Sequence, residues 1–181
     1  MGQELPVITT ERLVLRPFAL SDAAEVQRLA GDWAVADTTL NIPHPYPNGA
    51  AEQWISGHIE RFRIREIMTL AVTLRSGALA GCISLRLHDG HSRAELGYWM
   101  GVPYWNRGYC SEAARGLIAF GFEQMGLHRI YAHHLTRNPA SGRVMQKAGM
   151  RYEGTLRQHV KKHDRFEDLA TYGILYDEQQ P

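Results

Sequence analysis

The chain has 181 residues, of which 44% are hydrophobic and 22% charged, and its formal net charge is +1. A chain of this length and composition can bury a sufficient core without a disulfide or a structural metal. A charge this close to neutral argues against binding of nucleic acid through the overall field of the protein. We expect a single domain over residues 1–181, with its core from about residue 10 to residue 176.

From the first residues of the given sequence we expect no targeting signal. Residues 1–6 lack the basic stretch and apolar run of a secretory signal, and no segment reaches the ~20 apolar residues that a bilayer crossing requires. The only cysteines, Cys82 and Cys110, lie far apart and outside C-x-x-C spacing, so free thiols are expected. These features place the protein in the cytoplasm, away from membranes.

The first third of the chain predicts one strand and two helices. Residues 12–16 alternate as a half-buried strand does, and a helix begins at Ser21. The prolines within residues 41–49 exclude both helix and central strand, so this stretch is a loop. A second helix is expected over residues 51–66, with an apolar face. That face comprises Trp54, Ile55, His58, Ile59 and Phe62.

Three strand patterns follow, over residues 68–74, 81–87 and 93–100. The turns that separate them carry glycine and short polar residues typical of hairpins, so the three strands form an antiparallel meander. On the third strand, a period of two places Glu95 on one face and Tyr98 on the other.

The rest of the chain alternates helices and strands, expected over residues 111–125, 128–135, 138–149, 152–156 and 168–176. The basic segment Arg157–Arg165 joins the last two strands. It is most simply a solvated loop, the alternative being a rim that faces a substrate or partner. The order of elements predicts an α+β domain in which a mostly antiparallel mixed sheet carries helices on both faces.

The clearest candidate for a ligand site lies between the third meander strand and the following helix. Residues 97–114 contain a strand that stops, a short loop with Arg107 and Gly108, and a helix start. The first N–H groups of a helix have no partner within it, and a glycine lets the backbone approach a ligand closely. We interpret this stretch as a phosphate cradle.

Four blocks resemble the GNAT acetyltransferase superfamily, and within it the branch of ribosomal-protein N-terminal acetyltransferases (RimJ/RimL). They are TERLVLRP (10–17), AELGYWM (94–100), WNRGYCSEA (105–113) and NPASGRVMQKAGM (138–150). The resemblance covers nearly the whole chain and implies transfer of an acetyl group from acetyl-CoA to an amine. It also implies a GNAT-like sheet that splays open between the strands ending at Met100 and Leu135, with no metal.

The resemblance implies a set of coenzyme-binding residues. The family's loop motif has Gln or Arg at the position of Trp105 and Gly or Ala at the position of Cys110, whereas Gly108 matches. Asn138 matches an asparagine that bonds the pantetheine arm, although it could serve only as a helix cap. The full set is Tyr98, Trp99, Met100, Trp105, Asn106, Arg107, Gly108, Tyr109, Cys110, Ser111, Asn138 and Ser141.

Two residues are candidates for proton transfer. Ser141 matches a serine that points at the coenzyme sulfur, and the position of the family's usual tyrosine acid holds Met145, which cannot donate a proton. Ser141 is therefore the candidate acid, the alternative being a capping residue. Glu95 could take a proton from the attacking ammonium through a water, the alternative being a solvated glutamate or a partner of Arg93.

Other chemistry is less well supported by the sequence. Cys110 at a helix start could be a nucleophile, but we interpret it as a small spacer. The nine histidines show no zinc-binding spacing, so no metal site is expected. By resemblance, Trp33, His44 and Tyr46 lie in the region that shapes the amine-side pocket.

We therefore expect an acetyl-CoA-dependent N-acetyltransferase that works by direct attack of a neutral amine. The leading acceptor is a protein N-terminal α-amine, such as that of a ribosomal protein. The alternatives are a small amine (a polyamine, amino acid or aminoglycoside) and a CoA-binding module without turnover. The family also suggests a homodimer, which the sequence does not reveal.

Overall fold

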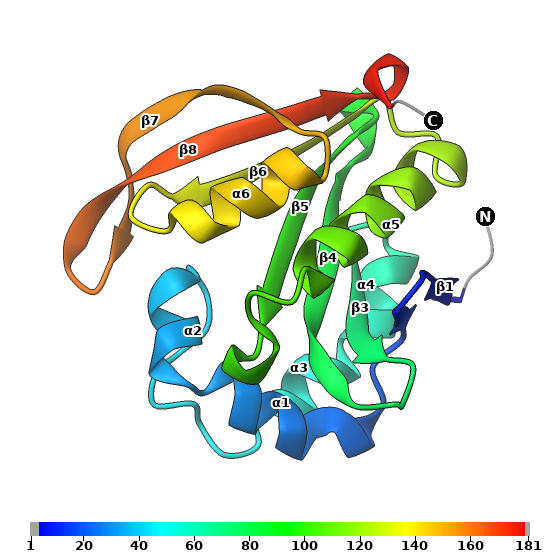
Figure 1. Cartoon of the computed structure of the whole chain (residues 1–181). Helices are drawn as coiled ribbons and strands as arrows, with labels where there is room; N and C mark the ends of the chain where they lie inside the picture. The colour runs from blue at the N-terminus through cyan, green and yellow to red at the C-terminus, as the bar shows by residue number, and fades with distance from the viewer. Residues whose placement is uncertain (1–3, 180–181) are drawn as a thin grey trace.

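The computed structural model describes residues 4–179, so Met1–Gln3 of the N-terminal segment and residues 180–181 lie outside it. Within that range, eight strands form one sheet in the order β1-β2-β3-β4-β5-β6-β8-β7 (Figure 1). The strands are β1 (Ile8–Thr9), β2 (Leu13–Arg16), β3 (Ile67–Leu74), β4 (Leu79–His88), β5 (Arg93–Met100), β6 (Arg129–Leu135), β7 (Arg151–Lys162) and β8 (Arg165–Leu175). The α-helices are α1 (Ala23–Ala30), α2 (Trp33–Thr38), α3 (Ala50–Ser56), α4 (His58–Arg63), α5 (Tyr109–Glu123) and α6 (Pro139–Lys147).

Helices cover both faces of the sheet, as expected. The side chains of Leu70 and Leu117 belong to a core on the side of α5 and α6, whereas Ala71 and Val26 belong to a core on the side of α1 and α3. The alternation of Leu70 and Ala71 along β3 is what divides the apolar residues between the two faces. None of the helices in residues 4–179 has the length and hydrophobicity of a membrane span.

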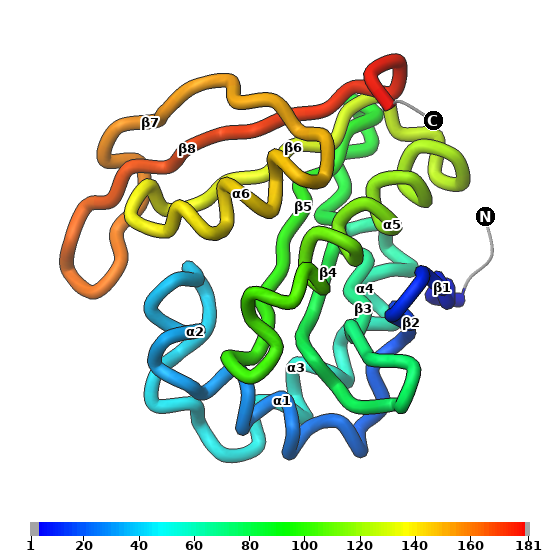
Figure 2. The backbone as a smooth tube through the Cα atoms, viewed as in Figure 1, coloured from blue at the N-terminus to red at the C-terminus, as the bar shows by residue number. Residues whose placement is uncertain are grey.

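The sheet is antiparallel except between β5 and β6, which run parallel. Their register holds only for Arg93–Glu95 against Arg129–Tyr131. Beyond these residues the two strands diverge toward their C-terminal ends (Figure 2). The expected splay between the strands that end at Met100 and Leu135 is confirmed.

Several helices and strands begin and end close to where the sequence pattern predicts. The strand expected over residues 93–100 has those bounds as β5, and the three meander strands pair antiparallel. The expected helix cap is also present, because the Asn138 side chain accepts a hydrogen bond from Ser141 N–H and Pro139 opens α6. Helix α5 buries the residues expected to face the core, which are Ala114, Leu117, Ile118 and Phe122.

The single helix expected over residues 51–66 is wrong. The chain instead forms α3 and α4, separated by Gly57, whose N–H bonds Trp54 O in a tighter turn (3.4 Å). Glycine weakens a helix, and the tight turn shifts the phase of the residues after it. Ile59, expected on the buried face, is consequently 54% exposed.

The loop expected at Arg157–Arg165 is also wrong. This segment forms the end of β7, a turn and the start of β8, so that the two strands make a long hairpin. His163 and Asp164 connect the paired residues Lys162 and Arg165, with φ values of 47° and 61°. Positive φ at both positions is what a two-residue type I′ hairpin turn requires, and the sequence did not indicate such a turn because neither residue is glycine.

His58 is a buried histidine without hydrogen-bond partners. It is 2% exposed, and neither ring nitrogen has a partner among the described residues. Its ring packs edge-on against Trp54 and Phe18, with centroids 4.3 and 5.4 Å away. Burial, with a smaller effect of the nearby Arg61 charge, lowers the pKa of His58 to about 4. The folded protein therefore keeps this ring neutral.

We predict that His58 makes folding sensitive to acid. Above pH ~6.5 the ring is neutral in both states, but below it the unfolded chain binds a proton that the native state excludes, at a cost of about 2 kcal/mol by pH 5. His58→Leu should remove this loss, measured by urea unfolding at pH 7.5 and pH 5. The exposed His91→Leu is the control. An unchanged pH dependence in His58→Leu would contradict the assignment.

Candidate active site

Two cavities in residues 4–179 meet at the splay between β5 and β6. The first, of about 350 Å³, lies between the end of β5, the loop of residues 104–111 and α6, and we call it the loop cavity. The second, of about 530 Å³, lies against β3, β4 and β5 and is walled by residues 38–43, and we call it the sheet cavity. Thr38, Thr39, Tyr98, Trp99 and Ser141 line both.

Within the described chain, the residues predicted from the sequence to bind the coenzyme all line the loop cavity, with one exception. Arg107 is outside the lining, and its carbonyl accepts a hydrogen bond from Arg12 Nη1 (3.0 Å). The lining includes Tyr98, Trp99, Met100, Trp105, Asn106, Gly108, Tyr109, Cys110, Ser111, Asn138 and Ser141.

Two cations that the sequence reasoning missed also line this cavity. Arg143 and Lys147 lie on α6 at a spacing of four residues, which places them on one face of the helix. That spacing is visible in the sequence and could have identified them. They add positive charge opposite the start of α5.

The start of α5 has the geometry of an anion cradle. Gly108 adopts a φ of 78°, a conformation that favours glycine, and the helix has no side-chain cap hydrogen bond there. The first intrahelical bond runs from Glu112 N–H to Gly108 O (3.0 Å), so the N–H groups of residues 109–111 precede it. These groups have no acceptor within the helix.

Cys110 is not poised as a nucleophile. Burial raises the pKa of its thiol to about 12, so the reactive thiolate is scarce near neutral pH. Its side chain instead packs beside the apolar core. This supports its interpretation as a spacer.

Among the described residues, histidine, cysteine and acidic side chains form no group of three or more suited to a metal ion.

Glu112 ties the cradle to the N-terminal strands. Its carboxylate accepts hydrogen bonds from Thr10 Oγ1 (2.6 Å), Arg12 N (2.7 Å) and Arg12 Nε (2.6 Å). Burial acts to raise the pKa of Glu112, but these hydrogen bonds and the Arg12 charge hold it below its usual value. The first and third sequence blocks are therefore in direct contact.

A tyrosine and a serine meet at the junction of the two cavities. Tyr98 Oη lies 2.9 Å from Ser141 Oγ and donates a hydrogen bond to Ser141 O at 3.1 Å. Burial raises the pKa of Tyr98, so the phenol keeps its proton. The sequence placed Tyr98 beside the coenzyme but gave no sign of its contact with Ser141, because 43 residues separate them.

Backbone N–H groups of β5 point into the splay. Gly101 N–H donates to Ala80 O of β4 (2.9 Å), and hydrogen-bonding direction alternates along a strand. The N–H groups of Tyr98 and Met100 therefore face the side from which β6 has departed. Trp105 Nε1 donates to Met100 O (2.7 Å) and so satisfies a carbonyl that the splay exposes.

The sheet cavity holds Glu95 and a histidine that the sequence reasoning missed. Glu95 lines this cavity, and the ion pairs found within residues 4–179 do not include one between Glu95 and Arg93. His133 lines the same cavity, and its Nδ1 lies 3.0 Å from Thr171 Oγ1. Burial lowers the pKa of His133, although the charge of Glu95 opposes this, so the ring is neutral near pH 7.

Of the aromatic residues expected around the acceptor, one lines the sheet cavity. Tyr46 does so, together with Trp54. Trp33 and His44 line neither cavity in the described part of the chain, and their rings pack edge to face with centroids 5.0 Å apart. His44 instead faces the end of α1, where its Nδ1 lies 3.1 Å from Gly31 O.

Known proteins resemble this chain over almost its full length. Residues 12–151 match the acetyltransferase (GNAT) domain family. The uncharacterized N-acetyltransferase YnaD of Bacillus subtilis is 32% identical over 173 residues, which cover 94% of this chain and 98% of that protein. The ribosomal-protein-serine acetyltransferase of Escherichia coli is 30% identical over 102 residues, 56% of this chain and 57% of that one.

The fold also matches solved structures. Mycobacterium smegmatis RimJ, in complex with CoA-disulfide, superposes with a TM-score of 0.89 at 21% identity, over 99% of this chain and 91% of that one. At this identity the likeness establishes the fold. It supports the mixed, splayed sheet expected from the four sequence blocks.

Proposed function

Because the chain belongs to the acetyltransferase (GNAT) family and is an acetyl-CoA-dependent N-acetyltransferase, we propose that its acceptor is a protein N-terminal α-amine, such as that of a ribosomal protein. The observation that carries the proposal is the sheet cavity of about 530 Å³, which meets the loop cavity at Tyr98 and Ser141. That volume accommodates several residues of an extended peptide. The similarity to a ribosomal-protein-serine acetyltransferase supports the same acceptor class.

The loop cavity fits the acetyl donor. The N–H groups of residues 109–111 and the cations Arg143 and Lys147 would hold the phosphates of acetyl-CoA. Asn138 would bond the pantetheine arm near the junction with the sheet cavity. Acetyl-CoA supplies the acetyl group as a thioester, and the residues of this chain position and polarise it.

The proposed chemistry takes place beside Tyr98 and Ser141. The N–H groups of Tyr98 and Met100 polarise the carbonyl oxygen of the thioester. Glu95 accepts a proton from the acceptor ammonium through a water, and the neutral amine then forms a C–N bond as the C–S bond breaks. Ser141 Oγ donates a proton to the departing sulfur and takes up the second proton of the reacting nitrogen, while Tyr98 Oη, 2.9 Å from Ser141 Oγ, keeps its own proton and holds the hydroxyl in place.

An acceptor panel tests the proposed function. Thiol release from acetyl-CoA should be faster with peptides that carry a free N-terminus than with N-terminally blocked peptides or with spermidine, amino acids and aminoglycosides. We expect kcat/KM for the best peptide to exceed that for the best small amine by at least about tenfold, since only the peptide fills the sheet cavity. Higher turnover of a small amine would overturn the acceptor assignment.

Ser141→Ala should lower kcat by about 100-fold, the usual scale of general acid catalysis, with KM for acetyl-CoA changed less than about threefold. Tyr98→Phe should lower kcat less, since Ser141 keeps its own proton. Steady-state kinetics with both substrates varied measure this. The control is Tyr152→Phe, since Tyr152 is exposed and its hydroxyl lies 2.8 Å from Thr155 Oγ1, away from both cavities. An unchanged kcat in Ser141→Ala would remove this residue from the mechanism.

Glu95→Gln should abolish the acidic limb of the pH profile of kcat/KM, because the amide cannot take up the proton. His133→Gln is the matched comparison, since this imidazole lines the same cavity. If the acidic limb of the profile is lost in His133→Gln and kept in Glu95→Gln, the histidine is the base and the assignment of Glu95 is wrong. Profiles from pH 5 to 9 with a peptide acceptor separate the two outcomes.

A further inference from the structure

One segment forms a wall that both cavities share. Residues 37–46, which we call the strap, run from the end of α2 toward α3. Thr38 and Thr39 line both cavities, and residues 40–43 and Tyr46 line the sheet cavity. The position of the strap therefore sets the width of the sheet cavity where it meets the loop cavity.

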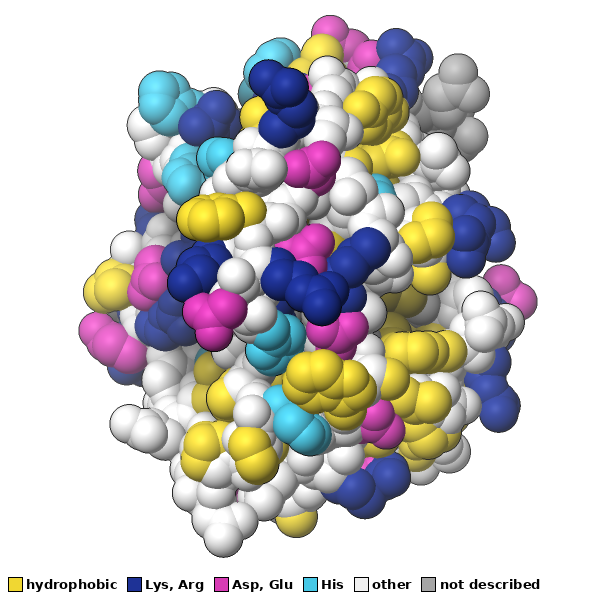
Figure 3. Space-filling view, turned by 90° about the vertical axis from the view of Figure 1, so that its left-hand side faces the viewer, with side chains coloured by type: hydrophobic (Ala, Val, Ile, Leu, Met, Phe, Trp, Pro, Cys, Tyr) yellow, Lys and Arg dark blue, Asp and Glu magenta, His cyan; other side chains and the backbone are white. Residues whose placement is uncertain are grey.

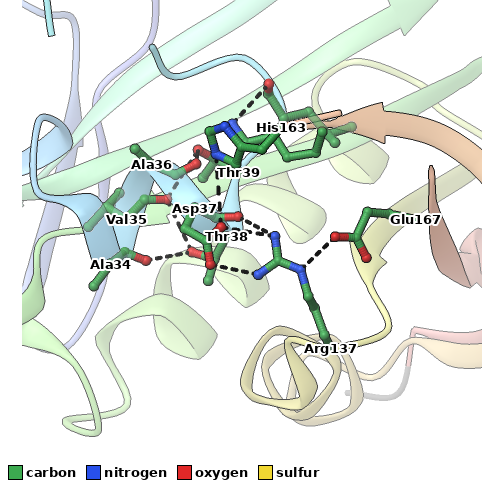
Figure 4. A network of polar contacts seen from close by, with 11 residues as sticks. Ala34, Val35, Ala36, Asp37, Thr38, Thr39, Arg137, His163 and Glu167 are labelled. Atoms are coloured by element: carbon green, nitrogen blue, oxygen red, sulfur yellow. Dashed lines mark hydrogen bonds and ion pairs between the residues drawn. The ribbon is translucent and has the colours of Figure 1, made fainter. Parts of the chain in front are cut away.

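A set of charged residues holds the start of the strap (Figure 4). Arg137 Nη1 donates to Asp37 Oδ2 (2.7 Å), and Arg137 Nη2 donates to Asp37 Oδ1 (3.2 Å) and to the Asp37 carbonyl (2.8 Å). Arg137 Nε donates to Glu167 Oε1 (2.9 Å). We call these three residues the clasp, which joins the strap to β8 through the loop that precedes α6.

The β7–β8 hairpin adds further contacts to the strap. Lys162 is 7% exposed, and its Nζ donates to Leu40 O at 3.4 Å. His163 Nε2 lies 3.9 Å from Asp37 Oδ1, and its ring packs against Trp33 with centroids 5.0 Å apart. On the face shown in Figure 3, to which α2 and the hairpin tip contribute, cationic, acidic and histidine side chains lie side by side.

Arg137 of the clasp is also adjacent in sequence to the N-cap of α6, which lies near the proposed reaction centre. Arg137 directly precedes Asn138, whose side chain accepts from Ser141 N–H at 3.4 Å. The same loop thus carries the clasp arginine at one residue and the cap of α6 at the next. The cap itself uses only the Asn138 side chain and Ser141 N–H, so it does not depend on the Arg137 side chain.

We propose that Arg137 is a positioning residue for the acceptor, acting through the clasp to hold the strap at the width that an N-terminal peptide requires. The inference rests on the proposed function, because it assigns the sheet cavity to the acceptor. Arginine suits the task because its planar fork reaches both oxygens of Asp37 while Nε reaches Glu167. A lysine would keep the charge and lose this geometry.

Loss of the Arg137–Asp37 ion pair should affect the strap and not the stability of the whole domain. The side chains of Arg137 and Asp37 are 35% and 30% exposed, so the ion pair contributes little to the stability of the whole protein. The contacts that Lys162 and His163 of the hairpin make with the strap are longer, at 3.4 Å to Leu40 O and 3.9 Å to Asp37 Oδ1. Loss of the clasp should therefore loosen residues 37–46 without unfolding the domain.

Kinetics of Arg137→Gln test the proposal. We expect KM for the peptide acceptor to rise about tenfold, because a strap that is no longer held by Arg137 leaves the sheet cavity without a fixed width for the peptide. KM for acetyl-CoA should change less than about threefold, because the anion cradle on α5 lies outside the clasp. Arg137→Lys should fall between wild type and Arg137→Gln. A peptide KM within twofold of wild type would overturn the proposal.

Arg129→Gln is the matched control. Arg129 also lies on the β6 side of the sheet and binds both carboxylate oxygens of one residue, Glu153, yet it lines neither cavity within residues 4–179. Its loss should leave both KM values unchanged. An equal rise of peptide KM in both variants would show a general loss of sheet order and would also overturn the proposal.

Hydrogen exchange separates this proposal from the assignment of function. Amides of residues 37–46 should exchange faster in Arg137→Gln than in wild type, whereas those of α5 should exchange at the same rate. This measurement is made on the protein without a peptide acceptor. If exchange changes as expected but no peptide is acetylated, the clasp stands as a structural element, and both the proposed function and the acceptor role of Arg137 fail. If peptides are acetylated but exchange and KM are unchanged, the clasp proposal alone fails.

Discussion

β5 and β6 pair over three residues each, Arg93–Glu95 with Arg129–Tyr131, and then part. A parallel pair that ends early leaves backbone groups of β5 without the neighbour that a continuous sheet would supply. Trp105 satisfies the Met100 carbonyl, and the Tyr98 side chain crosses toward Ser141 on α6. The remaining N–H groups face the space where the two cavities meet. The proposed reaction centre thus lies where the strand pairing is incomplete.

The start of α5 needs a support that the helix itself does not provide. With Gly108 as its N-cap and no capping side chain, the first turn has N–H groups without a partner in the helix, so capping does not stabilise it. Glu112 compensates by binding Thr10 and Arg12 on the N-terminal segment. This explains why the N-terminal block and the cradle block occur together, because each stabilises the other across about 100 residues of chain.

The sequence predicted those features of the fold that depend on residues close together in the chain. The bounds of β5, the buried face of α5 and the Asn138 cap all depend on residues within a few positions of one another. The break at Gly57 and the hairpin turn at His163 were missed because each needs a backbone geometry that neither residue type dictates. The clasp could not be predicted at all, since Asp37 and Arg137 are 100 residues apart and carry ordinary surface charges. The same holds for the contact of Tyr98 with Ser141.

The two interpretations of Ser141, helix cap partner and proton donor, do not compete. The cap uses its backbone N–H, which donates to Asn138 Oδ1, whereas the contact with Tyr98 uses its Oγ and its carbonyl oxygen. The cap fixes the backbone at the first turn of α6, and Tyr98 then restricts the rotamer of the hydroxyl. A hydroxyl held from both sides loses little entropy when it turns toward a departing sulfur. The part that Ser141 plays at the start of α6 is therefore compatible with its proposed role as proton donor, because the two use different atoms of the residue.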